Sequence, residues 1–310
     1  MRVRHYAVRA SLPLLCLVAA AQPRIDNVLI RMVPPGTTSM VGARMDQIRA
    51  TELYRKLVDQ RKLTQIDRFA RDTGFDPRRD VRELLFAATP SGGVMLARGS
   101  FRIHGEHMKN AKPVRHGEYT IWTSGNSGFC VLDTSLAAAG DTKSIEAALD
   151  EWKSGDHKGA LPLLAHAKDV DAGQPFWGVS TEFGHFLADH MAIPPGGIDF
   201  SKIFRGIQEA WFQSEFSNGV KGSLHGVTAS EQDAVTLRDT AKGLIGLGRL
   251  SVPENQPDLL KLWDGIEVEQ PGRSIAIRAD IPQTLVDQLV KMAGTGQLGT
   301  GGLRKAIPLP

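Results

Sequence analysis

A short stretch, residues 73–85, constrains the fold most, because helical periodicity ends in it and strand periodicity begins. Gly74 stands where a helix favours a left-handed C-terminal residue. Asp76 supplies a side-chain acceptor for the next turn, and Pro77 has φ already near the helical value. The apolar run that follows meets a second one across residues 90–93, whose glycines tolerate a tight hairpin loop. The stretch therefore predicts a helix, a capped turn and an antiparallel hairpin.

The same stretch is interpreted as architecture, since turn chemistry explains its residues apart from Arg78 and Arg79. Both arginines are expected to be exposed. Replacing either one by alanine should therefore change stability little.

The N-terminal segment has the pattern of a secretory signal peptide. Three arginines within the first nine residues precede an apolar run, 10–21, which is shorter than the about 20 residues that a membrane-spanning helix needs. The run ends in three alanines, so the mature chain is expected to begin at Gln22 and to have no membrane span. Cys16 offers the alternative of lipid attachment, but Leu15 precedes it, where lipidation favours a small residue. We expect a secreted or periplasmic protein.

Charge and cysteine content narrow the function classes. The chain has 37 Lys and Arg against 34 Asp and Glu, so loss of the three signal arginines leaves a formally neutral mature protein. A nucleic-acid partner would require a basic surplus gathered in a patch, and we expect none. Cys130 is the one cysteine that remains after cleavage, which rules out an intramolecular disulfide. Its place in a predicted strand favours an inert, buried thiol.

Two series of elements are predicted at about the same spacing. Residues 25–33 and 40–45 read as strands, followed by helices and the hairpin described above. A second series begins near residue 210 and turns at Asn218 and Gly219, a strong two-residue hairpin signal. The offset is about 180 residues, which indicates a diverged internal duplication. We therefore predict an α+β fold, with two related lobes of antiparallel sheet and helices packed on one face.

The predicted organisation is a signal peptide (1–21), an N-terminal α+β lobe (22–160), a C-terminal α+β lobe (161–293) and a flexible tail (294–310). Between the two series, further hairpin strands are predicted within 119–133, and a strand leading into a short helix within 176–191. Helices are predicted to begin at Asp141, Ser230 and Pro257, because each residue type favours a helix N-terminus.

Four short segments carry a resemblance to a group of proteins. They are Thr73-Gly74-Phe75-Asp76-Pro77 with Asp80-Val81 behind it, Leu96-Ala97-Arg98-Gly99-Ser100-Phe101, Ala138-Ala139-Gly140-Asp141 and Trp177-Gly178-Val179. Together they resemble uncharacterised secreted bacterial proteins with two diverged α+β lobes. The resemblance implies a fold and an extracytoplasmic location, and it brings no activity with it.

The densest group of metal-ligand residues is His104, Glu106 and His107, followed by His116 and Glu118. Histidines three apart lie on one face of a helix, and zinc takes three or four nitrogen and oxygen ligands. His104, His107 and His116 are therefore the candidate metal site. The alternative reading is an exposed connection, since glycine and lysines interrupt the segment.

Other candidate sites are outweighed by ordinary structure. His185, Asp189 and His190 lie on a predicted short helix whose other positions form a buried face. Residues 294–299 match the dinucleotide fingerprint, but they follow a helix, whereas the fingerprint works between a strand and a helix. No phosphate loop, nucleophile elbow or His-Glu-x-x-His sequence occurs in the chain.

The sequence thus favours a non-catalytic binding or scaffold protein of unknown ligand, acting outside the cytoplasm without a cofactor, with a protein or peptide among the expected partners. The alternative is a metal-dependent extracytoplasmic hydrolase that uses His104, His107 and His116.

Overall fold

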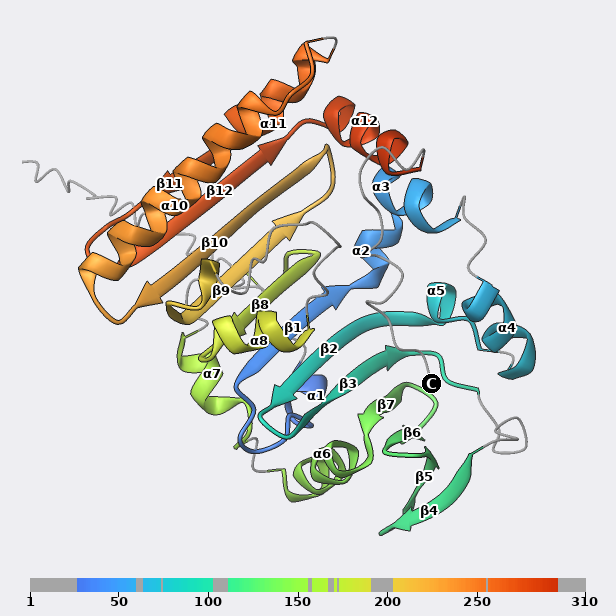
Figure 1. Ribbon diagram of the computed structural model, residues 1–310. Coiled ribbons are helices and arrows are strands. Elements are labelled where there is room, and N and C mark those ends of the chain that lie inside the picture. Colours follow the sequence, from blue (N-terminus) through green and yellow to red (C-terminus); the bar gives the residue numbers. More distant parts are fainter. Residues whose placement is uncertain are drawn as a thin grey trace, which may run out of the picture.

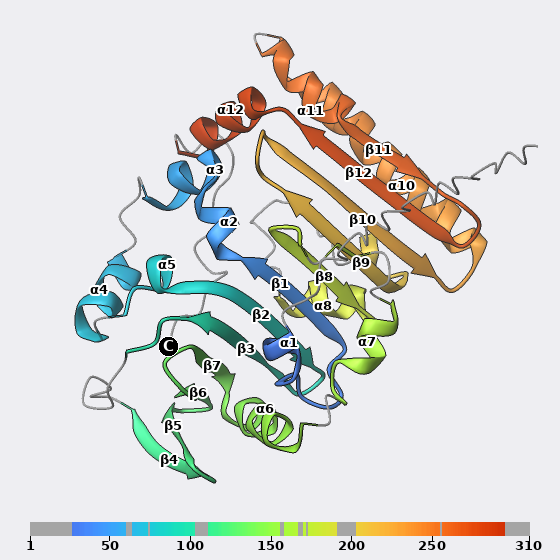
Figure 2. The same cartoon turned by 180° about the vertical axis from the view of Figure 1, so that it is seen from behind.

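The computed structural model describes residues 27–59, 64–73, 75–102, 111–155, 158–166, 170–171, 173–190, 203–254 and 256–294. Within these ranges the strands are β1 (Ser39–Arg44), β2 (Val81–Thr89), β3 (Gly92–Gly99), β4 (Lys112–His116), β5 (Tyr119–Ser124), β6 (Ser127–Val131), β7 (Leu136–Asp141), β8 (Phe176–Ser180), β9 (Ile207–Glu215), β10 (Val220–Thr228), β11 (Ile266–Glu269) and β12 (Ser274–Ile281). They form one 12-stranded sheet in the order β11-β12-β10-β9-β8-β1-β2-β3-β7-β6-β5-β4, and every pairing is antiparallel (Figures 1 and 2).

The described helices are α1 (Asn27–Ile30), α2 (Met45–Arg49), α3 (Glu52–Tyr54), a π-helical turn (Arg55–Asp59), α4 (Thr64–Thr73), α5 (Pro77–Asp80), α6 (Thr142–Ser154), α7 (Leu161–His166), α8 (Phe183–His190), α10 (Glu231–Leu250), a 3-10 turn (Pro257–Leu259), α11 (Leu260–Asp264) and α12 (Gln283–Gly294). None of them is both long enough and apolar enough to cross a membrane.

The predicted hairpins are confirmed. β2 and β3, β5 and β6, β9 and β10, and β11 and β12 pair as sequence neighbours. Three of the connections depend on glycine, since Gly125 has a φ of 60°, Gly219 a φ of 98° and Gly272 a φ of 60°, backbone conformations that other residues adopt at a steric cost.

Helix ends also follow the sequence. The Asp76 side chain accepts a hydrogen bond from the backbone N–H of Arg78, at 3.0 Å, and so caps α5, in which Pro77 occupies the first turn. Ser230 caps α10 in the same way. α6 ends at Gly155, which has a left-handed φ of 70°. Gly74 lies outside the described residues.

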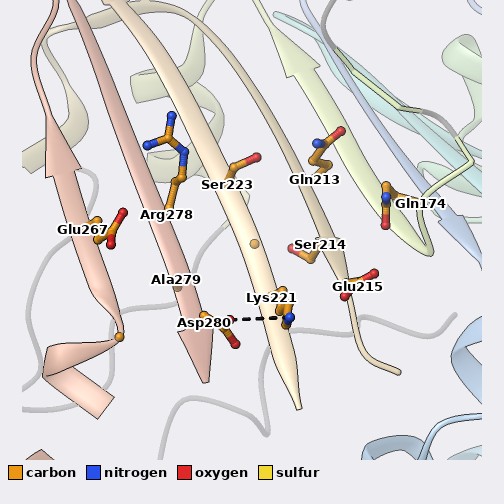
Figure 3. Close-up of a pocket in the computed structure, with 12 residues that line it drawn as sticks. Gln174, Gln213, Ser214, Glu215, Lys221, Ser223, Glu267, Arg278, Ala279 and Asp280 are labelled. Atoms are coloured by element: carbon orange, nitrogen blue, oxygen red, sulfur yellow. Dashed lines mark ion pairs between the residues drawn. The ribbon is translucent and has the colours of Figure 1, made fainter. Parts of the chain in front are cut away.

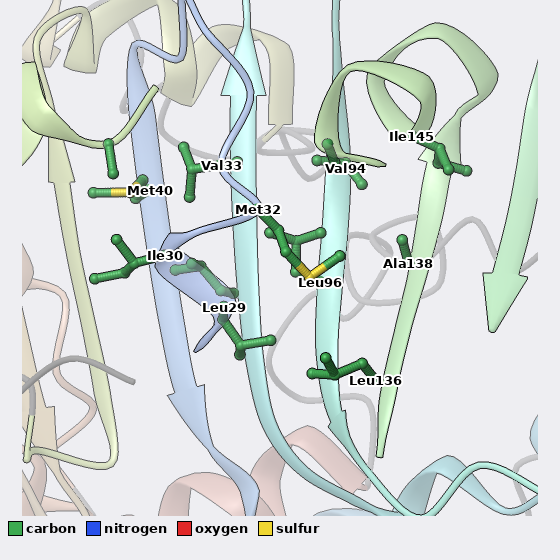
Figure 4. Close-up of a cluster of buried hydrophobic side chains, with 14 of the residues drawn as sticks. Leu29, Ile30, Met32, Val33, Met40, Val94, Leu96, Leu136, Ala138 and Ile145 are labelled. Atoms are coloured by element: carbon green, nitrogen blue, oxygen red, sulfur yellow. The ribbon is translucent and has the colours of Figure 1, made fainter. Parts of the chain in front are cut away.

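The prediction of a strand over residues 25–33 is wrong. Residues 27–30 form α1, and the backbone N–H groups of Met32 and Val33 donate to the carbonyls of Leu29 and Ile30. A short apolar run cannot be assigned to strand or helix by periodicity alone. Here the run forms a short helix and the turn after it, both packed in the core, and Met32 and Val33 are fully inaccessible to solvent (Figure 4).

The largest hydrophobic cluster lies on one face of the N-terminal part of the sheet, beneath α1, α6 and α7. Leu96 and Leu85 are directly paired residues of β3 and β2, so their side chains lie on the same face. Figure 4 shows α1 side chains meeting those of β1 and β3. Fully burying one such side chain contributes about 1.5–3 kcal/mol, so this layer fixes the position of β1, β2, β3 and β7.

The hydrophobic cluster of the C-terminal part lies on the opposite face of the sheet. The directly paired series that starts at Leu85 continues through Gly42 and Trp177 to Gln213 and then to Ser223, so that apolar side chains give way to polar ones after β8. The buried residues of β9 and β12, such as Ala210 and Ile275, point the other way, toward α8 and α10. Figure 1 shows α10 lying along β10, β11 and β12 on that side.

The α+β class with antiparallel pairing is therefore confirmed. In each part of the sheet, the helices that pack on its larger hydrophobic cluster lie on one face. The two predicted lobes share a single sheet, because β8 pairs with β1 on one side and with β9 on the other. The topology does not repeat. The offset of about 180 residues would match β1 with β10 and β2 with β11, yet β1 pairs with β2 whereas β10 pairs with β12. The boundary between 22–160 and 161–293 stays a prediction.

Candidate ligand-binding surface

A hollow of about 440 Å³ lies on the polar face of the C-terminal part of the sheet, opposite α10 (Figure 3). We call it the sheet hollow. Figure 2 shows this side of the molecule, and no described helix lies over β9, β10 and β12 there. Its lining comprises Gln174, Gln213, Ser214, Glu215, Lys221, Gly222, Ser223, Gly265, Glu267, Arg278, Ala279 and Asp280.

Strand pairing arranges the polar side chains in two rows. The first row runs Glu267, Arg278, Ser223, Gln213, each paired with the next across the sheet. The second row runs Asp280, Lys221, Glu215 in the same way. Because side chains alternate between the faces of a strand, residues two apart supply both rows. Directly opposed side chains have Cβ atoms about 4.5–5.5 Å apart, so the rows present polar groups at close intervals.

The charges of the hollow are interleaved. Lys221 Nζ lies 3.5 Å from Asp280 Oδ2, and Arg278 Nη1 lies 2.9 Å from Glu269 Oε2 at the margin. These ion pairs are exposed, and such pairs contribute about 0–1 kcal/mol to stability. Two cationic and three anionic side chains line the hollow itself, so the surface carries no strong potential of either sign.

A second hollow, of about 490 Å³, adjoins the first and shares Gln174 and Glu215 with it. It lies between the end of β9 and the α2–α3 segment, where Gln47 and Arg55 contribute to its lining. The two hollows therefore share part of their lining. One side chain of the sheet hollow is fixed, because Gln213 Oε1 accepts a hydrogen bond of 2.9 Å from the backbone N–H of Asp171.

An aromatic pair stands on the same face further along β9. Trp211 and His225 are paired across β9 and β10, and their rings are stacked with centroids 5.4 Å apart and planes 6° apart. Both side chains are partly exposed. They add a flat, partly apolar surface beside the polar rows.

Of the predicted metal site, only His116 falls within the described residues. It ends β4, and its Nε2 lies 2.8 Å from Asp150 Oδ1 of α6. His104 and His107 lie outside the described residues. In the part of the chain that the structure describes, no three His, Cys, Asp or Glu side chains are grouped as a metal site requires.

The remaining sequence candidates do not meet at a site. His185 and Asp189 are exposed on α8, and the side chain of His190 lies outside the described residues. Residues 295–299 of the fingerprint match are also outside. Cys130 is completely buried, and desolvation raises its pKa to about 11, as expected for an inert thiol.

Arg78 has a structural role. Its guanidinium donates to both carboxylate oxygens of Asp76, at 2.9 and 2.8 Å, and lies 2.8 Å from Asp67 of α4. The prediction that Arg78 is exposed is wrong, because its side chain is only 25% accessible. Arg79 is 73% accessible, as expected. The hydrogen bond from Arg78 lowers the pKa of Asp76.

The sheet hollow was not predicted from the sequence. Its signal was the alternation of Trp211, Gln213 and Glu215 with Ala210, Phe212 and Ser214 in β9. That alternation is also the ordinary pattern of a strand with one solvated face. Only the sheet order shows that four such strands lie side by side.

No protein-family model matches this chain, and no curated protein sequence matches it. Solved structures of the Treponema protein TP0453 are similar in fold. Its crystal form III superposes with a TM-score of 0.51 at 7% sequence identity, covering 84% of this chain and 97% of that one. Crystal form I gives a TM-score of 0.49 at 8% identity, covering 86% and 96%. At this level of identity the likeness establishes a shared fold and nothing about function.

Proposed function

We propose that this chain is a secreted or periplasmic, non-catalytic binding protein whose ligand lies in the sheet hollow. The proposal rests on one observation: the sheet face that helices cover in the N-terminal part is not the face that they cover in the C-terminal part. The face that α1, α6 and α7 cover in the N-terminal part continues over β9, β10 and β12, where no helix among the described residues covers it, and it is polar there.

Size and chemistry support a binding role. The volumes of the two adjoining hollows fall within the range of about 300–1,000 Å³ that is usual for ligand sites, and their polar side chains offer hydrogen-bonding groups to a ligand. Catalysis by a thiol is disfavoured because Cys130 is buried and its pKa is raised. The mixed charges of Lys221, Glu267 and their neighbours also disfavour a nucleic acid, which requires a cationic surface.

The proposal is tested with a substitution that fills the hollow. Ser223 is central in the first row, so Ser223→Tyr should block the site, whereas Gln232→Tyr on the exposed side of α10 serves as the control. Thermal shift against mixed panels of saccharides, peptides and amino acids should give a ligand that stabilises the wild type and the control, and not Ser223→Tyr. Turnover of that ligand, or equal stabilisation of Ser223→Tyr, would contradict the proposal.

The export step has its own test. Mass spectrometry of the exported protein should show an N-terminus at Gln22 and no lipid mass. A lipid-modified Cys16, or retention of the first 21 residues, would contradict this part of the proposal.

The alternative function, a metal-dependent hydrolase, would use His104, His107 and His116. Among the described residues only His116 bears on it, and its contact with Asp150 favours neither a ligand nor a structural role. Stoichiometric zinc that is lost in His107→Ala would establish the alternative.

A further inference from the structure

We infer that the ligand of the sheet hollow is an uncharged, hydroxyl-rich chain, that is, a neutral oligosaccharide. The inference rests on the proposed function and names the class of ligand. Three properties of the hollow carry it, namely its charge pattern, the donors and acceptors it offers, and its shape.

The charge pattern disfavours ligands with a strong charge of one sign. Lys221 stands between Asp280 and Glu215 in one row, and Arg278 stands beside Glu267 in the other. A polyanion would bring its charges next to carboxylates, and a polycation would bring them next to Lys221 and Arg278. Like charges in contact are costly, whereas a neutral ligand avoids both penalties.

The donors and acceptors come from side chains. The backbone groups of β9, β10 and β12 are used in pairing on both sides of each strand, so a peptide in the hollow could not be recognised by strand addition. The floor instead presents the hydroxyl of Ser223, the amide nitrogen of Gln213 and the amide oxygen of Gln174, while the other amide atoms of the two glutamines are hydrogen bonded to Asp171. Cations and carboxylates stand around them. A sugar hydroxyl both donates and accepts, so it can pair with every one of these groups.

The shape favours a chain over a small molecule. Small-molecule sites enclose most of the ligand surface. The sheet hollow instead has a floor of strands with no described helix above it, and the second hollow adjoins it at Gln174 and Glu215. A linear oligosaccharide several units long could lie along both hollows, with the partly exposed rings of Trp211 and His225 beside it.

Isothermal titration calorimetry of the exported chain tests the inference. The probes are cellohexaose and chitohexaose as neutral chains, hexagalacturonate as an anionic chain of similar length, and a neutral Gly-Ser peptide. A neutral hexasaccharide should bind, and its Kd should change less than about twofold between about 50 and about 300 mM salt. Hexagalacturonate should bind at least about tenfold more weakly, since its carboxylates would lie beside those of the hollow.

Variants separate hydrogen bonding from charge. Ser223→Ala should weaken the neutral hexasaccharide by roughly threefold to tenfold, the value of one hydrogen bond. Glu267→Gln should strengthen the binding of hexagalacturonate relative to the neutral hexasaccharide, because it removes one carboxylate from the hollow. Ser223→Tyr should abolish binding, and Gln232→Tyr should leave it unchanged.

Three outcomes overturn the inference. If the Gly-Ser peptide binds, Ser223→Tyr blocks it and neither neutral hexasaccharide binds, the proposed function stands and the ligand class is wrong. If hexagalacturonate is preferred, or affinity falls steeply with salt, the ligand is charged and the inference fails. Saccharide binding that Ser223→Tyr does not reduce places the site elsewhere, and the proposed function then fails as well.

Discussion

The junction between β1 and β8 can be tested at Gly42. A Cβ atom at this position would lie 2.3 Å from Cε2 and Nε1 of Trp177, whereas ordinary contacts begin near 3.4 Å. Trp177 is 3% exposed and belongs to the largest hydrophobic cluster, so its indole would have to move by about 1 Å within a close-packed interior. Overpacking of this kind costs about 1–3 kcal/mol. An alanine in a strand recovers about 0.5–1 kcal/mol relative to glycine.

We therefore expect Gly42→Ala to lower the free energy of unfolding by about 1–2 kcal/mol in urea denaturation. Gly243→Ala in α10 is the matched control. Its Cβ would meet nothing within 4 Å, so alanine there should stabilise the protein by up to about 1 kcal/mol. Trp177→Phe should be less costly in the Gly42→Ala background than in the wild type, with a coupling energy of about 1 kcal/mol. Additive effects of the two substitutions would refute the contact and, with it, the register between β1 and β8.

Four further predictions concern stability and reactivity. Arg78→Ala should destabilise the protein more than Arg79→Ala in urea denaturation, since Arg78 joins Asp76 to Asp67; equal effects would contradict the bridging role. Asp76→Ala should cost about 1 kcal/mol at pH 7 through loss of the cap. Arg78 lowers the pKa of Asp76 in the folded protein. The stabilisation by Asp76 is therefore present above its unfolded pKa of about 3.9 and is lost as the pH falls through the folded pKa. The deficit of Asp76→Ala should disappear in acid, and a deficit that persists there would contradict a role for the ionised carboxylate. Gly155→Ala should lower stability by about 1 kcal/mol in thermal denaturation, because a side chain is strained at the positive φ of this residue. A Cβ atom there would meet nothing within 4 Å, so the cost comes from the backbone alone, and no loss of stability would contradict the left-handed cap. The thiol of Cys130 should react with a disulfide reagent at pH 8 only after unfolding, and rapid reaction of the native protein would show that it is accessible.

Local elements were predictable because their causes are local. Asn218 and Gly219 mark the hairpin between β9 and β10, although its connection spans residues 216–219 and is longer than the two-residue turn that was predicted. Ser230 caps α10 with its own hydroxyl. β7 was missed because alanine and glycine dominate it, and these residues are depleted in strands. In this strand Gly140 must stay small, because a Cβ atom there would lie 2.3 Å from the carbonyl oxygen of Gly93 in β3.

Long-range pairing could not be predicted in this way. The order of strands depends on contacts between segments far apart in the chain, which no periodicity records. The sheet hollow depends on that order, because Gln213 and Arg278 meet Ser223 only when β9 and β12 flank β10. Each of these residues alone is an ordinary polar side chain on a solvated strand face.

The position of β8 also determines when the fold can be completed during synthesis. Ser39 of β1 and Ser180 of β8 are hydrogen bonded through their side chains at 2.7 Å and are separated by 141 residues. Until residue 180 has been made, one edge of β1 has no strand beside it, and an open edge is a template for pairing with another chain. A fragment that ends near residue 160 should therefore self-associate, and the intact chain should fold slowly for its size, since its central pairing waits for a late segment.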